Sequence, residues 1–334
     1  MRARRLAVAF AVSVLAEAAA LHAAGAAEPQ PPLVLEATIP LDHVAGRIDH
    51  LAIDLGRRRL IVAELGNGSV DVIDLATAKV AHRIAGLKAP QGVAATADII
   101  AAANADDGTV RLFHAGDFSA AKTIALGDDA DNVRIDPRGP RIIVGYGAGG
   151  LAIIEPTTGA KLAEVPLAAH PEGFQLDPIT GRIYVNVPNA RQIAVIDLAL
   201  GKQVASWTPP DLRENFPLAI EESGVTVASV FRRPARLVLI EAASGAIKAN
   251  VGTCGDADDV FFDTPRHRIY VSCGEGVVDV FQQDAEGPRR IARIPTSSGA
   301  RTALFVPELD RLFVAARAGL LGSAASILVL RPQP

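Results

Sequence analysis

The sequence has few of the residues and motifs that mark several large classes of protein. Only 4% of its 334 residues are aromatic, and it holds two cysteines and one tryptophan. No basic stripe with interleaved aromatic residues occurs, and the formal net charge is −4, so we expect no nucleic-acid partner. The C-x-x-C-H haem motif, the phosphate-binding loop and the G-x-S-x-G elbow are all missing. These absences remove the sequence support for haem, nucleotide and serine-hydrolase chemistry.

The first 27 residues have the pattern of a secretory signal. Three arginines open the stretch, the apolar segment LAVAFAVSVL follows, and the small residues at 24–26 suit cleavage by a signal peptidase. A membrane anchor is the alternative, but the apolar run is short for a span and Glu17 follows it closely. We therefore expect residues 1–27 to be removed, and the mature protein to be periplasmic or secreted without a membrane span.

Residues 28–334 are expected to form a single domain, because one repeat runs through them. Residues 46–87 show the unit: four short stretches of alternating apolar and polar residues, rich in Val, Ile and Leu, with turn-like segments between them. The apolar anchor of the first stretch recurs every 40 to 44 residues, at Leu51, Val93, Val133, Phe174, Leu218, Val260 and Ala303. This pattern predicts an all-β, seven-bladed β-propeller with four antiparallel strands per blade.

The ends of the repeat region predict how the ring closes. We place the blades at 48–86, 91–127, 131–167, 172–208, 216–251, 258–294 and 301–331. The last unit has only three strand-like stretches, whereas LVLEATIPL at 33–41 resembles a fourth strand. We predict that residues 33–39 pair with residues 325–330 and complete blade 7, because closure removes an open sheet edge.

Acidic residues recur at two turn positions, and we interpret them as turn residues rather than catalytic pairs. An acidic side chain in a turn accepts hydrogen bonds from the backbone of its own turn. The first position holds Asp54, Asp136, Asp177 and Asp263, and the second holds Asp74, Glu155, Asp197 and Glu241.

The polar residues at the starts of first strands and the ends of second strands form the candidate ligand site. In a propeller these positions should meet at one mouth of the central channel, where a ligand is expected. They differ from blade to blade, which favours ligand binding, whereas a solvated mouth that binds only water is the alternative. The candidate ligand-binding residues are His50, Glu64, Gln91, Asn132, Tyr146, Glu172, Asn186, Asp258 and Arg301.

We expect no resident cofactor, with one alternative. Carboxylates at the mouth, if they converge, could hold Ca²⁺ or a similar divalent cation through oxygen ligands. They lie on separate repeats without local ligand spacing, and the seven histidines form no cluster in the sequence. The residues for this alternative are Glu64, Asp131, Glu172 and Asp258.

The two cysteines fall in one unit. Cys254 precedes the first strand of blade 6 and Cys273 ends the second, so the hairpin brings both to the same face. We predict a Cys254–Cys273 disulfide, as exported proteins favour. A loop of this size would add roughly 3 kcal/mol to stability. Free thiols for redox or metal chemistry are the alternative.

Two segments carry a family resemblance. RIYVNV at 182–187 and RIYVSC at 268–273 resemble the core of the YVTN-type repeat, and residues 59–80 resemble its complete unit. The resemblance implies a seven-bladed propeller of the YVTN (YncE-like) class, usually exported in bacteria and similar in architecture to seven-bladed lactonases and quinoprotein-like propellers. The class shares no single activity. WD40 repeats are disfavoured because the Gly-His and Trp-Asp signatures are missing.

Two functional hypotheses follow. In the first, the protein is an exported, monomeric and non-enzymatic propeller whose channel mouth binds a small polar ligand or a partner protein. In the second, it is a lactonase-like hydrolase in which Glu64 or Glu172, with His50 as base or with a divalent ion, activates water. The hydrolase requires His50 or a metal within hydrogen-bond reach of a carboxylate, and the binding module does not. The residues say nothing for or against an accessory role beside a redox enzyme.

Overall fold

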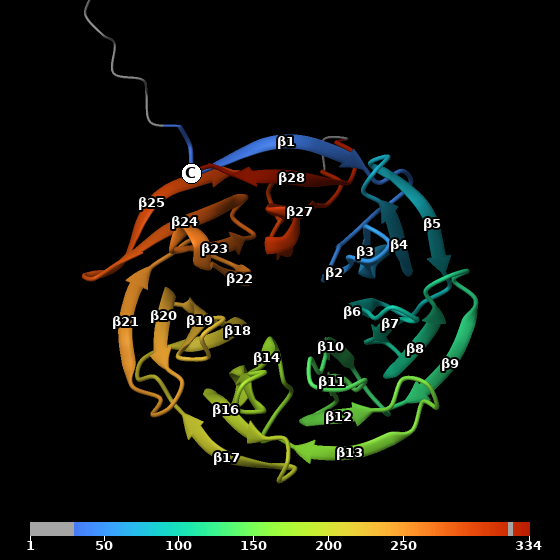
Figure 1. The fold of residues 1–334 in the computed structure, drawn as a ribbon, viewed down its shortest axis with the longest axis horizontal. Helices are drawn as coiled ribbons and strands as arrows, with labels where there is room; N and C mark the ends of the chain where they lie inside the picture. Colours follow the sequence, from blue (N-terminus) through green and yellow to red (C-terminus); the bar gives the residue numbers. More distant parts are fainter. Residues whose placement is uncertain (1–29, 320–322) are drawn as a thin grey trace, which may run out of the picture. The chain divides into compact units, whose positions relative to one another are not determined.

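Seven four-stranded antiparallel sheets form a ring in the computed structural model, which describes residues 30–319 and 323–334 (Figure 1). The predicted signal segment, 1–27, lies outside the described residues. Within each sheet the strands follow the order of the chain, except that blade 7 takes its outermost strand from the N-terminal side. The predicted all-β, seven-bladed propeller is confirmed.

The strand bounds define the blades. Blade 1 has β2 (Leu51–Asp54), β3 (Arg59–Glu64), β4 (Ser69–Asp74) and β5 (Lys79–Ala85), and blade 2 has β6 (Pro90–Ala95), β7 (Ile99–Asn104), β8 (Thr109–His114) and β9 (Ala120–Ala125). Blade 3 has β10 (Ala130–Ile135), β11 (Ile142–Tyr146), β12 (Gly150–Ile154) and β13 (Lys161–Pro166), and blade 4 has β14 (Phe174–Leu176), β15 (Arg182–Val187), β16 (Gln192–Asp197) and β17 (Lys202–Trp207). Blade 5 has β18 (Arg213–Ile220), β19 (Thr226–Arg233), β20 (Ala235–Glu241) and β21 (Ile247–Gly252). Blade 6 has β22 (Ala257–Asp263), β23 (Arg268–Cys273), β24 (Val277–Asp284) and β25 (Gly287–Pro295). Blade 7 has β26 (Ala303–Val306), β27 (Arg311–Ala316), β28 (Ser326–Pro332) and β1 (Leu33–Pro40).

Within the described residues, four short 3₁₀ helices lie between consecutive strands: η1 (Leu65–Asn67), η2 (Pro188–Ala190), η3 (Thr264–Arg266) and η4 (Pro307–Leu309). Each ends in a residue with left-handed backbone geometry, as a tight turn requires. Among the described residues no helix has the length and hydropathy needed to cross a bilayer.

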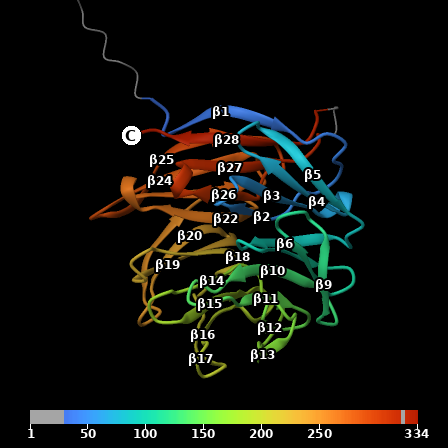
Figure 2. The same ribbon diagram turned by 45° about the vertical axis from the view of Figure 1, so that its right-hand side comes forward.

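The ring closes as the sequence predicts. β1 pairs antiparallel with β28, from Leu33 opposite Pro332 to Pro40 opposite Ser326. Both Figure 1 and Figure 2 show β1 along the outer edge of β28. The chain therefore joins its two ends inside one sheet, and the outer edge of β28 is covered.

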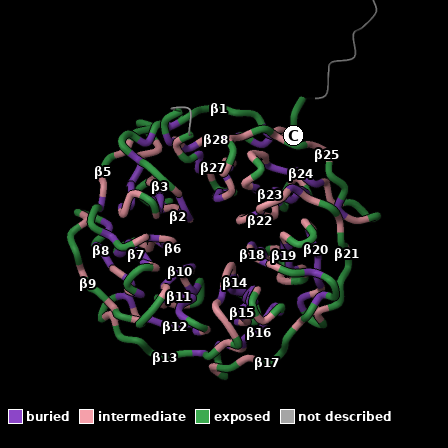
Figure 3. The backbone as a smooth tube through the Cα atoms, turned by 180° about the vertical axis from the view of Figure 1, so that it is seen from behind, coloured by how far each residue is buried: buried purple, intermediate pink, exposed green. Residues whose placement is uncertain are grey.

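The apolar core lies between blades. Ile61 and Val72 of blade 1, for example, belong to one buried cluster with Ile100 and Phe113 of blade 2. The inner strands are largely buried, whereas the fourth strand of most blades is largely exposed (Figure 3). Aliphatic side chains fill these layers, as the scarcity of aromatic residues predicts.

Most of the recurring acidic residues accept hydrogen bonds from the backbone of their own turns, as expected. Asp136 accepts a hydrogen bond from the backbone N–H of Arg138 at 2.9 Å, and Asp74 accepts one from Ala76 at 2.7 Å. Asp263 differs, because its donors are side chains: Arg266 Nη1 in its own turn and the hydroxyl of Tyr270 within the blade. These carboxylates stabilise the scaffold, and they lie outside the channel mouth.

Candidate functional site

A cavity of about 170 Å³ lies at the mouth of the central channel, and all seven blades contribute to its wall. The wall is made almost wholly of charged and polar side chains: Arg47, His50, Gln91, Asp129, Asp131, His170, Glu172, Phe216, Arg232, Asp258 and Arg301. We call it the mouth cavity. A larger cavity of about 290 Å³ continues along the inner strands, and His50 borders both.

Most side chains of the cavity wall come from one equivalent position in each blade, which lies two residues before the apolar anchor of the first strand. In blades 2 to 7 this position holds Gln91, Asp131, Glu172, Phe216, Asp258 and Arg301. In blade 1 it holds Asp49, which is buried, and the adjacent His50 reaches the cavity instead. The fold thus collects one side chain per blade around a single axis.

Five of the nine residues that we predicted for the site meet in the mouth cavity. These are His50, Gln91, Glu172, Asp258 and Arg301. The other four, Glu64, Asn132, Tyr146 and Asn186, lie elsewhere. Three of the four are second-strand ends, which stand one strand farther from the axis and point into the layers between strands and blades.

Glu64 lies inside blade 1 and is fully buried. Its carboxylate accepts hydrogen bonds from Ser69 and from Asn67, and Arg83 Nε lies 3.8 Å away. Burial, and then a hydrogen bond shared with Asp71, raises the pKa of Glu64 to about 8. Glu64 is therefore not available to a ligand or a metal at the channel mouth.

Asn186 ties blade 4 to blade 5. Its amide donates to the backbone carbonyls of Phe216 and Pro217 at 3.0 and 2.9 Å, and its oxygen accepts from Asn215 and Ser229. It fixes the backbone of Phe216, which does line the cavity. Asn186 therefore supports the wall of the cavity without lining the cavity itself.

Asn132 and Tyr146 are both buried in blade 3. A register shift between Ala130 and Val133 turns Asp131 toward the cavity while its neighbour Asn132 is covered. Tyr146 packs in the core between blades 2 and 3. Neither side chain forms part of the cavity wall.

One side of the cavity is a network of arginines and aspartates. Asp258 accepts from Arg232 Nη2 at 2.6 Å and lies 3.2 Å from Arg301 Nε. Arg301 Nη1 also contacts Asp256 at 2.8 Å. Arg232 stacks 3.8 Å above the Phe216 ring centroid. The arginines and aspartates therefore neutralise one another's charges, and their contacts join blades 5, 6 and 7 along this side.

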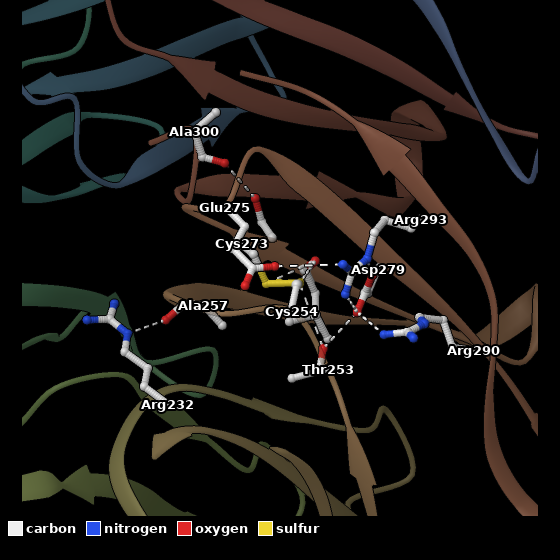
Figure 4. The surroundings of a disulfide bond; sticks show 12 residues. Arg232, Thr253, Cys254, Ala257, Cys273, Glu275, Asp279, Arg290, Arg293 and Ala300 are labelled. Carbon is white, nitrogen blue, oxygen red and sulfur yellow. Dashed lines mark hydrogen bonds and ion pairs between the residues drawn. A yellow bond between two sulfur atoms is a disulfide. The ribbon is translucent and has the colours of Figure 1, made fainter. Parts of the chain in front are cut away.

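The predicted disulfide supports this wall. Cys254 and Cys273 are bonded, with their Cα atoms 6.0 Å apart, and both are buried. Figure 4 shows the bond close to Ala257, whose carbonyl accepts a hydrogen bond from Arg232 Nε at 2.9 Å. The disulfide therefore fixes the segment that carries Asp258.

The opposite side of the cavity, from blades 3 and 4, joins a histidine to carboxylates. His170 Nδ1 lies 2.6 Å from the carbonyl oxygen of Gly147, and Nε2 lies 3.6 Å from Asp131 Oδ2. Burial lowers the pKa of His170, but attraction to the Asp131 carboxylate and a hydrogen bond to the Gly147 carbonyl outweigh it and raise the value to about 9. Burial and the charge of Asp131 raise the pKa of Glu172 to about 8. These groups were not all expected together, because His170 and Asp129 precede their strands in irregular segments.

Two glycines let the inner strands approach closely beside these groups. A Cβ at Gly92 would lie 2.1 Å from the carbonyl oxygen of Asp131, and one at Gly173 would lie 2.5 Å from that of Phe216. Only glycine fits such contacts without displacing backbone. Both precede an anchor residue, so they set how tightly the wall of the cavity closes.

In the part of the chain that the structure describes, His50 forms no hydrogen-bonded pair with a carboxylate. Its Nε2 lies 3.8 Å from Asp49 Oδ1, and its Nδ1 lies 4.0 Å from Asp259 Oδ2. Burial lowers the pKa of His50. The geometry that we required for His50 as a catalytic base is therefore not met here.

Comparison with known proteins identifies the architecture. No protein-family model matches the chain, and no curated protein matches it. A chain of Kuenenia stuttgartiensis hydrazine synthase matches in structure with a TM-score of 0.74 and 16% sequence identity, over 86% of this chain and 97% of that one. The likeness is one of fold. Membership of the YVTN class stays an expectation from the sequence.

Proposed function

We propose that this protein is a non-enzymatic binding propeller whose mouth cavity holds a small polar ligand. The observation that carries the proposal is the convergence of charged and polar side chains from all seven blades on one small cavity. A volume of about 170 Å³ equals the share of about six water molecules, so the ligand has only a few non-hydrogen atoms. A partner protein would fit only by inserting a single side chain.

Export is part of the proposal. The pattern of residues 1–27 supports it, and the disulfide is compatible with an extracytoplasmic location. A periplasmic or secreted binding protein meets small polar solutes directly, which agrees with a cavity open at the channel mouth.

Thermal unfolding with a ligand panel tests the proposal. The purified, disulfide-bonded protein is melted in EDTA with acetate, glycine, ethanolamine or glycerol, because a ligand of the folded state raises Tm. We expect at least one compound to raise Tm. The shift should disappear in Gln91→Phe, which fills the cavity, and persist in Thr123→Phe, which places the same ring on the exposed outer strand of the same blade.

An equal shift in both variants would place the ligand elsewhere on the protein. A panel without any shift in the wild-type protein would refute a site for small organic ligands.

A lactonase-like hydrolase is the second candidate, and one observation favours it. Asp131, His170 and Glu172 each offer a ligand atom within 4.8 Å of the other two, and among the described residues His50 belongs to no such group. The test is hydrolysis of γ-butyrolactone with Zn²⁺ or with EDTA. Hydrolysis that needs the metal and is lost in Glu172→Gln would favour the enzyme over the binding module.

A further inference from the structure

We infer that Asp131, His170 and Glu172 bind one divalent transition-metal ion, of the class of Zn²⁺ or Mn²⁺, inside the mouth cavity. The inference rests on the proposed binding function, since it names what one side of the same cavity holds. Asp131 comes from β10, and His170 and Glu172 come from the segment before β14. The site thus lies between blades 3 and 4, opposite the arginine network.

The three side chains are close enough to share an ion. One donor atom from each can be chosen so that all lie within 4.8 Å of one another. Around an ion with four ligands at about 2.1 Å, neighbouring donor atoms lie about 3.4 Å apart. A shift of about 1 Å in the side chains therefore suffices to bring all three into contact with the metal.

Asp131 is the second, independent indication of a ligand. Its exposure is only 6%, and it lines the cavity. Within residues 30–319 and 323–334, no hydrogen bond to its carboxylate is formed, and His170 Nε2 lies 3.6 Å from it. A carboxylate this buried normally has a hydrogen-bond donor or a metal as partner.

The orientation of His170 suits a metal ligand. Metal-binding histidines commonly donate one ring N–H to a carbonyl, which fixes the ring and frees the other nitrogen. Here Nδ1 contacts the Gly147 carbonyl at 2.6 Å, and Nε2 is directed at Asp131. With the Nδ1 proton held toward Gly147, metal binding displaces the Nε2 proton and frees the lone pair of Nε2 on the side of Asp131.

The charges of the cavity also favour a cation on this side. Each wall arginine already has a carboxylate: Arg47 pairs with Asp49 at 2.8 Å, and Arg232 and Arg301 pair with Asp258. No arginine or lysine pairs with Asp131 or Glu172 in the described parts of the chain. A divalent ion would neutralise them where the arginines do not.

The donor set selects the class of metal. Ca²⁺ takes oxygen ligands, usually six to eight of them, whereas an imidazole with two carboxylates suits Zn²⁺, Mn²⁺ or Co²⁺. Asp258, which we had considered as a Ca²⁺ ligand, is already paired with arginines, and Glu64 lies inside blade 1. Three protein ligands leave a coordination position for a small ligand in the cavity.

Metal titration of the purified, disulfide-bonded protein without a polyhistidine tag tests the inference. Isothermal titration with Zn²⁺, Mn²⁺ and Ca²⁺ should show one site for the transition metals and weaker binding of Ca²⁺. Co²⁺ should give a visible absorption band at one equivalent. His170→Gln and Glu172→Gln should lower the affinity about 100-fold or more, and should remove the Co²⁺ band.

Matched controls carry the same substitutions at exposed positions. His114→Gln and Glu164→Gln should bind within about twofold of wild type, because exposed charges outside the site act weakly. Circular dichroism establishes that each variant is folded. Absence of a wild-type site, or equal affinity in all four variants, overturns the inference and assigns any binding to surface residues.

The organic-ligand panel in EDTA separates this inference from the proposed function. If metal binding fails but the panel still shifts Tm, the binding function stands and the metal is wrong. If metal binds at one site and no organic compound binds, the metal site stands and the small-organic-ligand proposal is wrong.

Discussion

Glu64 and Asp71 are two buried carboxyls that share one arginine inside blade 1. Arg83 donates to both oxygens of Asp71 at 2.7 Å, and lies 3.8 Å from Glu64. One guanidinium does not neutralise two carboxylates in a medium of low polarity, so the pair retains a proton. This agrees with the pKa of about 8 for Glu64, which burial and Asp71 together produce.

Glu64→Gln should therefore change how stability depends on pH. Between pH 4.5 and 8 the folded chain keeps a proton that the unfolded chain releases, so stability falls as pH rises through this window and levels off above it. An amide keeps the neutral, donating form. We expect the Tm of the variant to exceed wild type by about 2 °C or more at pH 8.5, and by less at pH 5.

Thermal melting between pH 5 and 8.5 checks this prediction. Glu164→Gln, an exposed change of the same kind, serves as the control and should follow the wild-type curve. Parallel curves for wild type and Glu64→Gln would show that Glu64 is ionised in the folded state.

The site residues were predictable to the extent that they follow the repeat. Gln91, Glu172, Asp258 and Arg301 share one offset from the anchor, and that offset could also have found Phe216. A prediction that used this offset alone, and left out the ends of the second strands, would have named the wall residues more accurately. His170 has no such signature, because its place depends on how a loop without regular structure folds back to Gly147.

At the scale of elements, the inner strands of neighbouring blades must approach closely to shape the cavity. Gly92 on β6 lies against the backbone of β10, where a Cβ would meet the Asp131 carbonyl oxygen at 2.1 Å. Backbone cannot yield locally as a flexible side chain can, so any larger residue moves one strand relative to the other. Asp131 would move with it.

Gly92→Ala should destabilise the protein and disturb the mouth cavity. Forced repacking of this kind costs about 1–3 kcal/mol, and we also expect weaker metal binding because Asp131 is displaced. Gly139→Ala is the control, since a Cβ there meets nothing within 4 Å. Urea unfolding and Zn²⁺ titration measure the two effects. A Gly92→Ala protein with wild-type stability would mean that the two strands separate easily.

The elements themselves were largely predictable, because alternation and turn chemistry are local. Every predicted blade end lies within three residues of the observed one. The Cys254–Cys273 bond was likewise predictable, since a hairpin brings both residues together. The close approach at Gly92 was not, because contacts between blades depend on the ring geometry and leave no periodic pattern in the sequence.

At the scale of the whole molecule, one strand holds the ring closed. β1 comes from the start of the described chain and pairs with β28 near its end, so blade 7 joins residues about 290 positions apart in the sequence. Ile39 of β1 is 2% exposed and packs in the cluster between blades 7 and 1, whereas Leu35 of the same strand is 54% exposed. The strand is thus anchored by a few inward side chains.

Ile39→Ala should weaken this closure, and Leu35→Ala should not. Removing buried methyl groups at Ile39 costs about 2–4 kcal/mol, whereas the exposed change costs about 0.5 kcal/mol or less. Hydrogen exchange locates the effect: β28 amides should exchange faster in Ile39→Ala, because the paired edge opens, and at the wild-type rate in Leu35→Ala. If β28 stays equally protected in both variants while Ile39→Ala loses stability, the Ile39 side chain stabilises the core but does not hold the ring closed. Closure then depends on the β1–β28 backbone hydrogen bonds.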